Sequence, residues 1–437
     1  MSGIAEILIN LGYEVSGSDL KSSEQTRRLQ SLGAKIFTGH FPSNITDYHV
    51  VVTSSAIDHT NPEIIEAKKR NIPIIHRSEM LAELVRLKHG IGVAGTHGKT
   101  TTSSMLASVL SDGGMNPTAV IGGKVFNFGS NARAGEGQYI VFEADESDGS
   151  FLKLLPSIAI VTNIDADHLD HYKYFEAVKD AFLTYINNIP FYGYSVLCTD
   201  DNVIRELLPR IERPYYTYGF NEDADFTAHN VRMENGKTCF TCNYKKEPVG
   251  DFILSQLGNH NVLNSLSVIA VALELGLKYE AIRDGLKNFE GVGRRLERIG
   301  EKNGILVMDD YGHHPTEIRA TLSALKNLGR RIVVIFQPHR YTRTELLWDE
   351  FGQSFANADE VFLTDIYPAG EDPIEGVSTD LICQAVKKHE NRDVVLISKF
   401  EDIAASVVKV LKDGDVVVTL GAGDIHKAGP MILELIK

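Results

Sequence analysis

Apolar residues along the first 88 positions alternate between short continuous runs and longer stretches in which they recur every three or four residues. Short runs are typical of buried strands, and the wider spacing is typical of amphipathic helices. The pattern predicts strands at residues 13–18, 35–37, 49–54 and 72–76, and helices at residues 1–11, 26–32, 61–70 and 78–87. Strands separated by helices favour a parallel sheet covered on both faces, so we expect an α/β domain here.

The same alternation continues through two further segments. In the second, it predicts a strand, a glycine-rich turn and a helix over residues 90–110, strands at 139–144 and 158–164, a helix at 174–188, a β-rich stretch at 225–254 and a helix at 261–275. In the third, it predicts strands at residues 305–309, 331–336, 360–364, 394–397 and 415–420, with helices between them. Glycines at 291 and 293 suit a hinge. We therefore expect three α/β domains, at residues 1–88, 89–292 and 293–437.

The composition is that of an ordinary globular protein, with 437 residues of which 43% are apolar and 23% charged. The net charge of −14 argues against a general binder of nucleic acid or of anionic membranes, because such proteins present a basic face. No apolar run is long enough for a transmembrane helix, and no signal-peptide pattern opens the sequence, so we expect a cytoplasmic protein. Four cysteines do not make a disulfide scaffold, and Cys239 and Cys242 are expected to be two thiols of a hairpin, since a zinc ribbon needs a second pair.

Residues 92–102 read GVAGTHGKTTT and stand between an apolar strand and a helix. Glycines allow backbone N–H groups to converge on phosphate oxygens, and the helix N-terminus adds the positive end of its dipole. Lys99 can reach the β- and γ-phosphates of a nucleotide, and Thr100 can offer its hydroxyl to Mg²⁺. The strict motif has glycine where Val93 stands, and the alternative is a chance glycine-rich turn. The residues predicted to bind nucleotide are Gly95, Thr96, His97, Gly98, Lys99, Thr100 and Thr101.

Two other predicted strands of this segment end in polar residues. Glu143 is the first of four acids at the end of the strand at 139–144, which is where a parallel sheet places a magnesium ligand. For Glu146 and Asp148 a solvated acidic loop is the favoured interpretation. His168 lies in a polar cluster beyond the strand at 158–164, and a neutral imidazole there can bind a second Mg²⁺, although oxygen ligands are commoner.

Two consecutive strands of the third segment also end in polar loops, which read DYGHHP at residues 310–315 and FQPHRYTR at residues 336–343. The guanidinium groups of Arg340 and Arg343 can bind a carboxylate. His313, His314 and His339 can orient that carboxylate or receive protons from an amine. The alternative is an unremarkable polar edge of the sheet, but two such loops at neighbouring strand ends favour a binding site.

Taken together, these segments resemble the Mur ligase family. The resemblance rests on GTHGKTTT at 95–102, FEADESDGSF at 142–151, TNIDADHLDHY at 162–172, GNHNVLNS at 258–265, DDYGHHPTEI at 309–318 and FQPHRYTR at 336–343. It implies a Rossmann-like UDP-binding domain, a central P-loop ATPase domain and a C-terminal Rossmann-like domain that binds an amino acid. It also implies a reaction of peptidoglycan precursor synthesis, in which ATP phosphorylates the carboxylate of UDP-N-acetylmuramate and the amine of L-alanine then displaces the phosphate.

The resemblance also implies roles for single residues. ATP and two Mg²⁺ would be held by Lys99, Thr100, Glu143 and His168, with Asn261 and Asn264 at the base of ATP and Arg294 and Arg295 near its phosphates. The two asparagines have a simpler alternative, which is to cap the helix that they open. The UDP group would be faced by Ser18, Asp19, Ser54 and Ser55. The residues expected to take part in catalysis are Lys99, His168, His314 and Arg340.

The family pattern begins with a strand and a loop of the form G-x-G-G-x-G, whereas this sequence starts at Met1-Ser2-Gly3. We expect a start codon assigned too late and, in a product of this length, a damaged first domain, because the first strand of such a sheet is central. Two other functions stay open. One is a sister ligase with another donor or acceptor, including one that attaches an intact peptide, and the other is a non-catalytic P-loop regulator. We expect a monomer or weak homo-oligomer, without nucleic-acid partners or membrane insertion.

Overall fold

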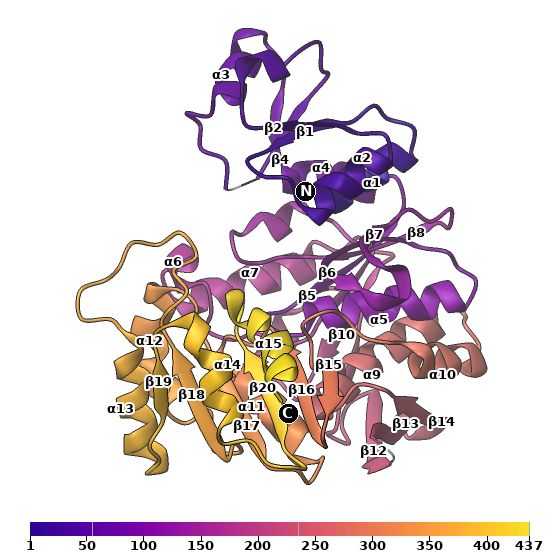
Figure 1. Cartoon of the computed structure of the whole chain (residues 1–437). Helices are drawn as coiled ribbons and strands as arrows, with labels where there is room; N and C mark the ends of the chain where they lie inside the picture. Colours follow the sequence, from indigo (N-terminus) through magenta and orange to yellow (C-terminus); the bar gives the residue numbers. More distant parts are fainter. Residues whose placement is uncertain (55, 235, 437) are drawn as a thin grey trace. The chain divides into compact units, whose positions relative to one another are not determined.

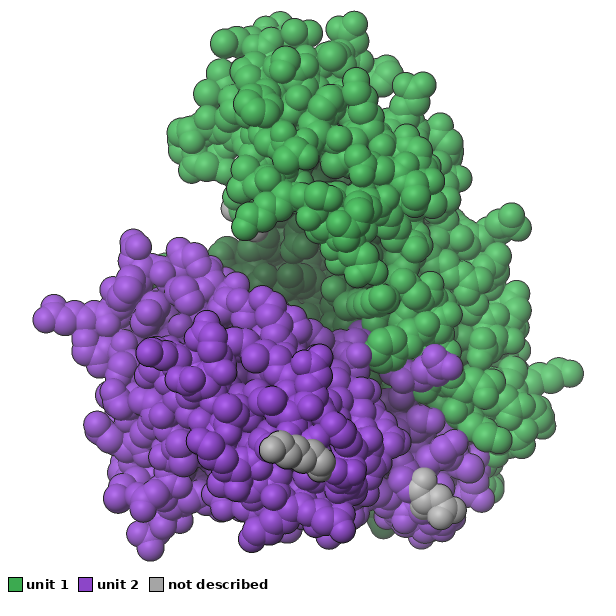
Figure 2. All heavy atoms as spheres, viewed as in Figure 1, with its two compact units in different colours: residues 1–227, 242–250, 264–289 green, residues 228–241, 251–263, 290–437 purple. Residues whose placement is uncertain are grey.

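The computed structural model describes residues 1–54, 56–234 and 236–436 (Figure 1). It divides into two compact units, which Figure 2 colours separately. Unit 1 contains Met1–Thr227, Cys242–Gly250 and Asn264–Phe289, and unit 2 contains Ala228–Thr241, Asp251–Leu263 and Glu290–Lys437. Unit 1 therefore holds the whole first predicted domain and most of the second. Ser55, one of the predicted UDP-facing residues, lies outside the described residues.

The first 88 residues of unit 1 form short elements. The helices are α1 (Ser2–Asn10), α2 (Glu24–Ser31), α3 (Pro62–Lys69) and α4 (Arg77–Arg86), and the strands are β1 (Ser16–Asp19), β2 (Lys35–Thr38), β3 (Val51–Thr53) and β4 (Ile74–His76). The strands are parallel as predicted, but they pair as β1–β2 and β3–β4 in two separate sheets. The expectation of one continuous sheet is therefore wrong for the described residues. These strands have only three or four residues and no fully buried position, so they lack the apolar faces that a central strand presents.

The remainder of unit 1 is a larger α/β layer. Its helices are α5 (Lys99–Asp112), α6 (Leu169–Tyr172), α7 (Phe175–Asn187), α8 (Asn202–Leu207) and α10 (Tyr279–Asn288), and its strands are β5 (His89–Ala94), β6 (Thr118–Val125), β7 (Ser130–Arg133), β8 (Tyr139–Glu143), β9 (Ile158–Val161), β10 (Tyr194–Cys198) and β11 (Tyr215–Gly219). They are ordered β11-β10-β9-β5-β8-β6-β7, and only the β6–β7 pair among these is antiparallel. The division between the units passes through β12 (Phe226–Glu234), β13 (Lys237–Tyr244), β14 (Glu247–Leu254) and α9 (Asn259–Glu274).

Strand β5 lies at the centre of this layer, with β8 on one side and β9 on the other. Ile91 is in register with Val141 of β8 and Ile158 of β9, and all three side chains are buried. Such continuous apolar strands are typical of a parallel sheet that is covered on both faces. Because parallel strands share a direction, the segments that follow β5, β8 and β9 meet at one edge, which is where ligands bind in open α/β sheets.

Unit 2 contains a second α/β layer over residues 297–436. Its helices are α11 (Pro315–Lys326), α12 (Tyr341–Phe351), α13 (Thr379–Glu390), α14 (Phe400–Val408) and α15 (Ala428–Leu435), and its strands are β15 (Glu297–Lys302), β16 (Ile305–Asp310), β17 (Ile332–Phe336), β18 (Glu360–Thr364), β19 (Val395–Ile397) and β20 (Val416–Leu420). The strand order is β15-β16-β20-β17-β18-β19, with β15 antiparallel to the rest. Buried residues form one apolar core with α11, α12 and α13 and another with α14 and α15.

All four cysteines are free thiols, and Cys239 and Cys242 are both buried in β13. The prediction of two thiols in a β-rich segment is confirmed. No described helix combines the length and the apolar character that crossing a bilayer requires.

Candidate active site

The turn between β5 and α5 has the shape that the phosphate-loop motif predicts. Gly95 has φ +133°, and a Cβ on it would lie 2.1 Å from Oγ1 of Thr162, so this position has neither the conformation nor the space for a side chain. Gly98 has φ +83°, and a Cβ on it would lie 2.9 Å from Oδ1 of Asn264. Lys99 is the first residue of α5, so the loop ends at a helix N-terminus, where backbone N–H groups favour an anion.

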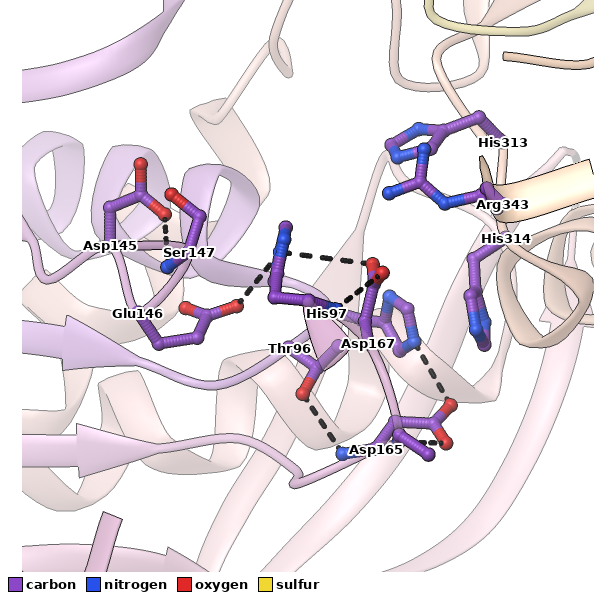
Figure 3. Close-up of polar contacts among 12 residues, drawn as sticks. Thr96, His97, Asp145, Glu146, Ser147, Asp165, Asp167, His313, His314 and Arg343 are labelled. Carbon is purple, nitrogen blue, oxygen red and sulfur yellow. Dashed lines mark hydrogen bonds and ion pairs between the residues drawn. The ribbon is translucent and has the colours of Figure 1, made fainter. Parts of the chain in front are cut away.

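The segment that follows β9 holds this loop in place. Oγ1 of Thr162 donates to the carbonyl oxygen of His97 at 2.6 Å, and the backbone N–H of His97 donates to Oδ1 of Asn163 at 2.8 Å. The N–H of Asp165 donates to Oγ1 of Thr96 at 2.9 Å, and the Asp165 carboxylate lies 3.2 Å from Nε2 of His97 (Figure 3). The sequence interpretation missed Thr162, Asn163 and Asp165 as supports of the loop. Their place just beyond a buried strand next to β5 was the available signal.

Lys99 is engaged by a carboxylate from the end of β8. Its Nζ donates to both carboxylate oxygens of Glu146 at 2.8 Å and to the carbonyl oxygen of Gly95 at 2.6 Å. Burial lowers the pKa of the Lys99 ammonium, but the carboxylates of Glu146 and Asp145 outweigh this effect, and the pKa is raised. Glu146 is only 1% exposed, so its interpretation as a solvated loop residue is wrong. The side chain turns inward because the buried ammonium compensates its charge.

Thr100 and Glu143 form a second pair beside Lys99. Oγ1 of Thr100 donates to Oε2 of Glu143 at 3.1 Å, and the N–H of Gly122 donates to Oε1 of Glu143. Burial raises the pKa of the Glu143 carboxyl against the effects of the Gly122 N–H and the Lys99 ammonium. A hydroxyl and a carboxylate are the hard oxygen donors that Mg²⁺ prefers, so the chemistry of this pair fits that ion. Thr101, the next residue of α5, is buried instead.

His168 stands at the start of the short helix α6 with φ +57°. Its Nε2 lies 3.7 Å from Oε1 of Glu146, so the structure brings it to the acidic end of β8. Helix α6 is tied to the same segment, because the hydroxyl of Tyr172 donates to the carbonyl oxygen of Glu146 at 2.6 Å. In the same acidic segment, Asp145 accepts from the N–H of Ser147 (Figure 3). His168 therefore contacts the Lys99–Glu146 pair, while Thr100 contacts Glu143.

The two asparagines of α9 fall in different units. Asn264 belongs to unit 1, where its amide lies against the position of Gly98 in the phosphate loop. Asn261 belongs to unit 2, where its Nδ2 donates to the carbonyl oxygen of Leu257 at 2.8 Å. Beside it, burial and the charge of Arg295 lower the pKa of His260 to about 4.

The predicted UDP-facing residues lie at strand ends of the first 88 residues. The hydroxyl of Ser18 lies in a small polar cluster. Its Oγ donates to Oε2 of Glu63 at 2.6 Å and lies 2.9 Å from Nδ1 of His40. Asp19 is exposed and accepts from the N–H of Lys21. Ser54 follows β3 and is half-buried.

In unit 2, the loop after β16 carries two histidines with different surroundings. Nδ1 of His313 lies 3.0 Å from the carbonyl oxygen of Tyr311, and burial lowers the pKa of this imidazole to about 3. His314 is the N-cap of α11: its ring accepts from the N–H of Thr316, and Glu317 accepts from its backbone N–H. His314 thus has a structural role at a helix start that the sequence interpretation did not consider.

The loop after β17 presents two arginines and a histidine. Burial, followed by the charges of Arg343 and Arg340, lowers the pKa of His339 to about 4. Nη1 of Arg343 lies 3.3 Å from Nδ1 of His339, and the rings of His313 and His339 are 5.6 Å apart. The Arg340 side chain is 42% exposed. The structure therefore brings these predicted residues together at the carboxyl-end edge of the unit 2 sheet.

Arg294 and Arg295 follow the glycine pair, and both guanidinium groups lie over the ring of Tyr311, at 5.0 and 5.2 Å from its centroid. Arg294 donates to Oδ2 of Asp309 at 3.1 Å and to the carbonyl oxygen of Gly421 at 2.5 Å. These contacts commit the Arg294 guanidinium to the framework of unit 2. Arg295 lies 3.6 Å from the carboxylate of Glu317.

Comparison with known proteins accounts for nearly the whole chain. Three family models match in order: "Mur ligase family, catalytic domain" at residues 1–89, "Mur ligase middle domain" at 93–272 and "Mur ligase, glutamate ligase domain" at 294–423. The chain is 53% identical to the UDP-N-acetylmuramate–L-alanine ligase of Geotalea daltonii, over 100% of this chain and 96% of that protein. It is 55% identical to the enzyme of the same name from Geobacter sulfurreducens, over 99% and 94%.

Solved structures agree with this assignment. The UDP-N-acetylmuramate–alanine ligase MurC of Thermotoga maritima superposes with a TM-score of 0.82 at 29% identity, covering 99% of this chain and 96% of that one. A murein peptide ligase of Psychrobacter arcticus superposes with a TM-score of 0.72 at 26% identity, covering 100% and 96%. The chain therefore belongs to the Mur ligase family and is an ATP-dependent ligase that forms an amide bond.

Proposed function

We propose that this protein joins L-alanine to the carboxylate of UDP-N-acetylmuramate, with an acyl phosphate as intermediate, in peptidoglycan precursor synthesis. The observation that carries the proposal is the identity of more than half of all positions, along the full chain, with ligases of that name. A carboxylate is a poor electrophile because its oxygen is a poor leaving group. Transfer of the γ-phosphoryl group of ATP converts that oxygen into phosphate, which departs when the amine attacks.

The nucleotide would bind at the turn between β5 and α5. In this proposal the backbone of Gly95, Thr96, His97 and Gly98 cradles the phosphates, and Lys99 neutralises charge that develops on the γ-phosphate. The short Lys99–Glu146 pair supports this role, because it holds the ammonium beside the loop. Asn264, packed against Gly98, would contact the nucleotide, as the family resemblance also implies for Asn261 and Arg295.

Thr100, Glu143 and His168 would hold Mg²⁺. The oxygen donors of Thr100 and Glu143 are adjacent, and His168 lies at the same acidic segment through Glu146. When bound, the ion supplies positive charge that lets an anionic carboxylate approach an anionic triphosphate. Burial raises the pKa of the Glu143 carboxyl, and a bound cation would favour its ionised form.

The amino acid would bind at the carboxyl-end edge of the unit 2 sheet. We call this the His–Arg edge, because it carries His313, His339, Arg340 and Arg343. Arg340 and Arg343 would hold the carboxylate of L-alanine. His313 and His339, whose pKa values are lowered to about 3 and about 4, are neutral at pH 7 and can accept a hydrogen bond from the amine. His314 would take part in catalysis from its position as the N-cap of α11.

The sugar nucleotide would bind within residues 1–88, with Ser18, Asp19 and Ser54 facing the UDP group. Residues 89–292 would then form the ATP-binding domain and residues 293–437 the amino-acid-binding domain. We place the enzyme in the cytoplasm, where both nucleotides are available, as a monomer or weak homo-oligomer.

Release of ADP, measured with UDP-N-acetylmuramate and each candidate amino acid in turn, tests the proposal. Alanine-dependent ADP release with one amide product per ADP, identified by mass spectrometry, is the expected result. A rate of ATP hydrolysis that neither substrate changes would instead indicate a P-loop regulator.

A sister activity is favoured by one observation, the superposition on a murein peptide ligase over the full chain. Such an enzyme would accept a peptide in place of alanine. The same assay with L-alanyl-γ-D-glutamyl-meso-diaminopimelate, the peptide named for another solved ligase of this kind, distinguishes the two, because only the sister activity would release ADP with it.

A further inference from the structure

In unit 2, the loop that follows β18 contacts the segment after β17, which carries Arg340 and Arg343. The N–H of Arg340 donates to the carbonyl oxygen of Tyr367 at 2.8 Å, and the N–H of Tyr367 donates to the carbonyl oxygen of Pro338 at 2.8 Å. His339 and Tyr367 form a parallel bridge, and their rings stack with centroids 5.6 Å apart and planes 11° apart. The backbone around Arg340 thus takes its position from a loop more than 20 residues further along the chain.

Glu371 of that same loop makes a closer set of contacts. Its Oε2 accepts from the backbone N–H of Thr342 at 3.1 Å, and its Oε1 accepts from Oγ1 of Thr342 at 2.7 Å. The same Oε1 lies 3.7 Å from Nη1 of Arg340. One carboxylate therefore binds the first turn of α12 through its backbone and also pairs with the guanidinium that precedes it.

The start of α12 needs such a partner. Arg340 and Arg343 place two positive charges at the end of a helix where the dipole is also positive, which is unfavourable. Arg340 has φ +72°, a left-handed conformation that costs an arginine on the order of 1 kcal/mol or more. A Ser or Asp at the N-cap usually accepts from the first turn, and here Glu371 provides that acceptor from another loop. Its negative charge offsets the arginines and the dipole together.

We propose that Glu371 is a positioning residue for the amino-acid substrate, because it fixes the start of α12 and with it the directions of the Arg340 and Arg343 guanidinium groups. The inference rests on the proposed function, in which these arginines bind the carboxylate of the acceptor. Glu371 acts through Arg340 and Thr342 and does not touch the reacting atoms.

The test compares Glu371→Ala, Glu371→Gln and the control Glu375→Ala, an exposed glutamate of the same loop. Glu371→Ala is expected to raise KM for L-alanine about tenfold, the change that about 1.4 kcal/mol produces, with kcat and KM for ATP changed less than about twofold. Glu371→Gln keeps an oxygen for Thr342 and loses the charge, so it is expected to raise KM for L-alanine about threefold. Glu375→Ala is expected to match the wild type. An unchanged KM for L-alanine in Glu371→Ala, or an equal rise in every KM together with a lower melting temperature, overturns the proposal.

A measurement without substrates separates this inference from the proposed function. Phenylglyoxal labelling with peptide mapping is expected to modify Arg340 about threefold faster in Glu371→Ala than in the wild type, with Arg298 as internal reference, because the ion pair no longer competes. Equal labelling rates overturn the inference even if the wild type makes no amide. Failure of the wild type to make amide, with the labelling difference present, overturns only the proposed function.

Discussion

The phosphate-loop edge of unit 1 and the His–Arg edge of unit 2 both lie at the carboxyl ends of parallel strands, but they hold their functional groups in different ways. In unit 1, the loop is clamped by the adjacent strand end at Thr162–Asp165, and its cation is buried against Glu146. In unit 2, Arg340 is 42% exposed, and its backbone is held by a loop from the next strand. The Lys99 ammonium is largely covered and paired with a buried carboxylate, whereas the Arg340 guanidinium is partly exposed.

The proposed function gives this difference a chemical reason. Phosphoryl transfer depends on placing fixed charge around a group whose own charge is redistributed in the transition state, so rigid positioning is favourable. In the proposed function, a small amino acid enters and is held by its carboxylate, which the partly exposed Arg340 guanidinium would allow. Damage at the first edge should therefore affect both fold and turnover, and damage at the second should affect mainly the acceptor.

The largest effect is expected for Lys99→Ala, which should lower ligation by at least about 10²–10³-fold. The sequence alone suggests a loop cation whose loss leaves the fold intact, but the Lys99 side chain is only 15% exposed and pairs with the buried Glu146, so its removal also leaves a buried carboxylate unpaired. We expect a loss of about 3 kcal/mol in the free energy of unfolding, measured in urea. The double variant Lys99→Met with Glu146→Gln should recover most of that stability while staying inactive. Retained ligation in Lys99→Ala would remove the loop from the site.

Gly95→Ala tests the clamp in unit 1. The new Cβ would meet Oγ1 of Thr162 in a backbone conformation with φ +133°, so we expect a loss of about 2 kcal/mol or more in the free energy of unfolding and weakened ATP binding. The matched control is Gly114→Ala, where φ is +81° and the Cβ meets nothing within 4 Å. That control should cost about 1 kcal/mol from its conformation alone and leave ATP binding unchanged. Equal losses in both variants would show that contact with Thr162 is unimportant.

Arg340→Ala tests the open edge of unit 2. We expect KM for L-alanine to rise about tenfold or more, with ATP affinity changed less than about twofold, because an exposed guanidinium contributes little to the fold. Initial rates at varied alanine and at varied ATP measure the two effects. Arg298→Ala, a change at another exposed arginine of unit 2, is the control. Kinetics identical to the wild type would take Arg340 out of the site.

The smallest effect is expected from pH. Folded His339 gains its proton only near pH 4, whereas an ordinary histidine does so near 6.5, so the unfolded chain binds more protons between these values. Stability should therefore fall as pH decreases from 6.5 to 4, with a contribution from His339 on the order of 1 kcal/mol. His339→Gln should remove that part of the decline in urea titrations at several pH values. His59→Gln, at an exposed position, should not. A decline unchanged by His339→Gln contradicts the role of burial.

The sequence predicts the elements that have a continuous apolar run and whose conformation does not depend on a particular neighbouring strand. The β5–α5 unit and the strands from β16 to β20 fall close to their predicted residues. The interpretation missed β6, β7, β10, β11 and β15, whose residues mix polar, glycine and aromatic positions and depend on a neighbouring strand for their conformation. It also joined β1–β4 into one sheet, because pattern alone does not reveal which strands pair.

The residues of the candidate site also divide into those that the sequence reveals and those that only the fold reveals. The residues proposed to face a ligand stand in recognisable motifs, so Lys99, Thr100 and Arg340 could be proposed from the sequence. Their supports were not, because Thr162 and Glu371 become neighbours only through the fold. Glu146 was misinterpreted for the same reason, since its inward orientation depends on an ammonium 47 residues away.

The short helix α6 has a consequence of its own. It lies between two residues other than glycine with left-handed backbones, His168 at φ +57° and Lys173 at φ +70°. Four helical residues flanked by two such conformations have almost no intrinsic preference for this shape. A peptide of residues 167–173 would therefore be a random coil in water. The orientation of the His168 side chain is set by the surrounding tertiary structure.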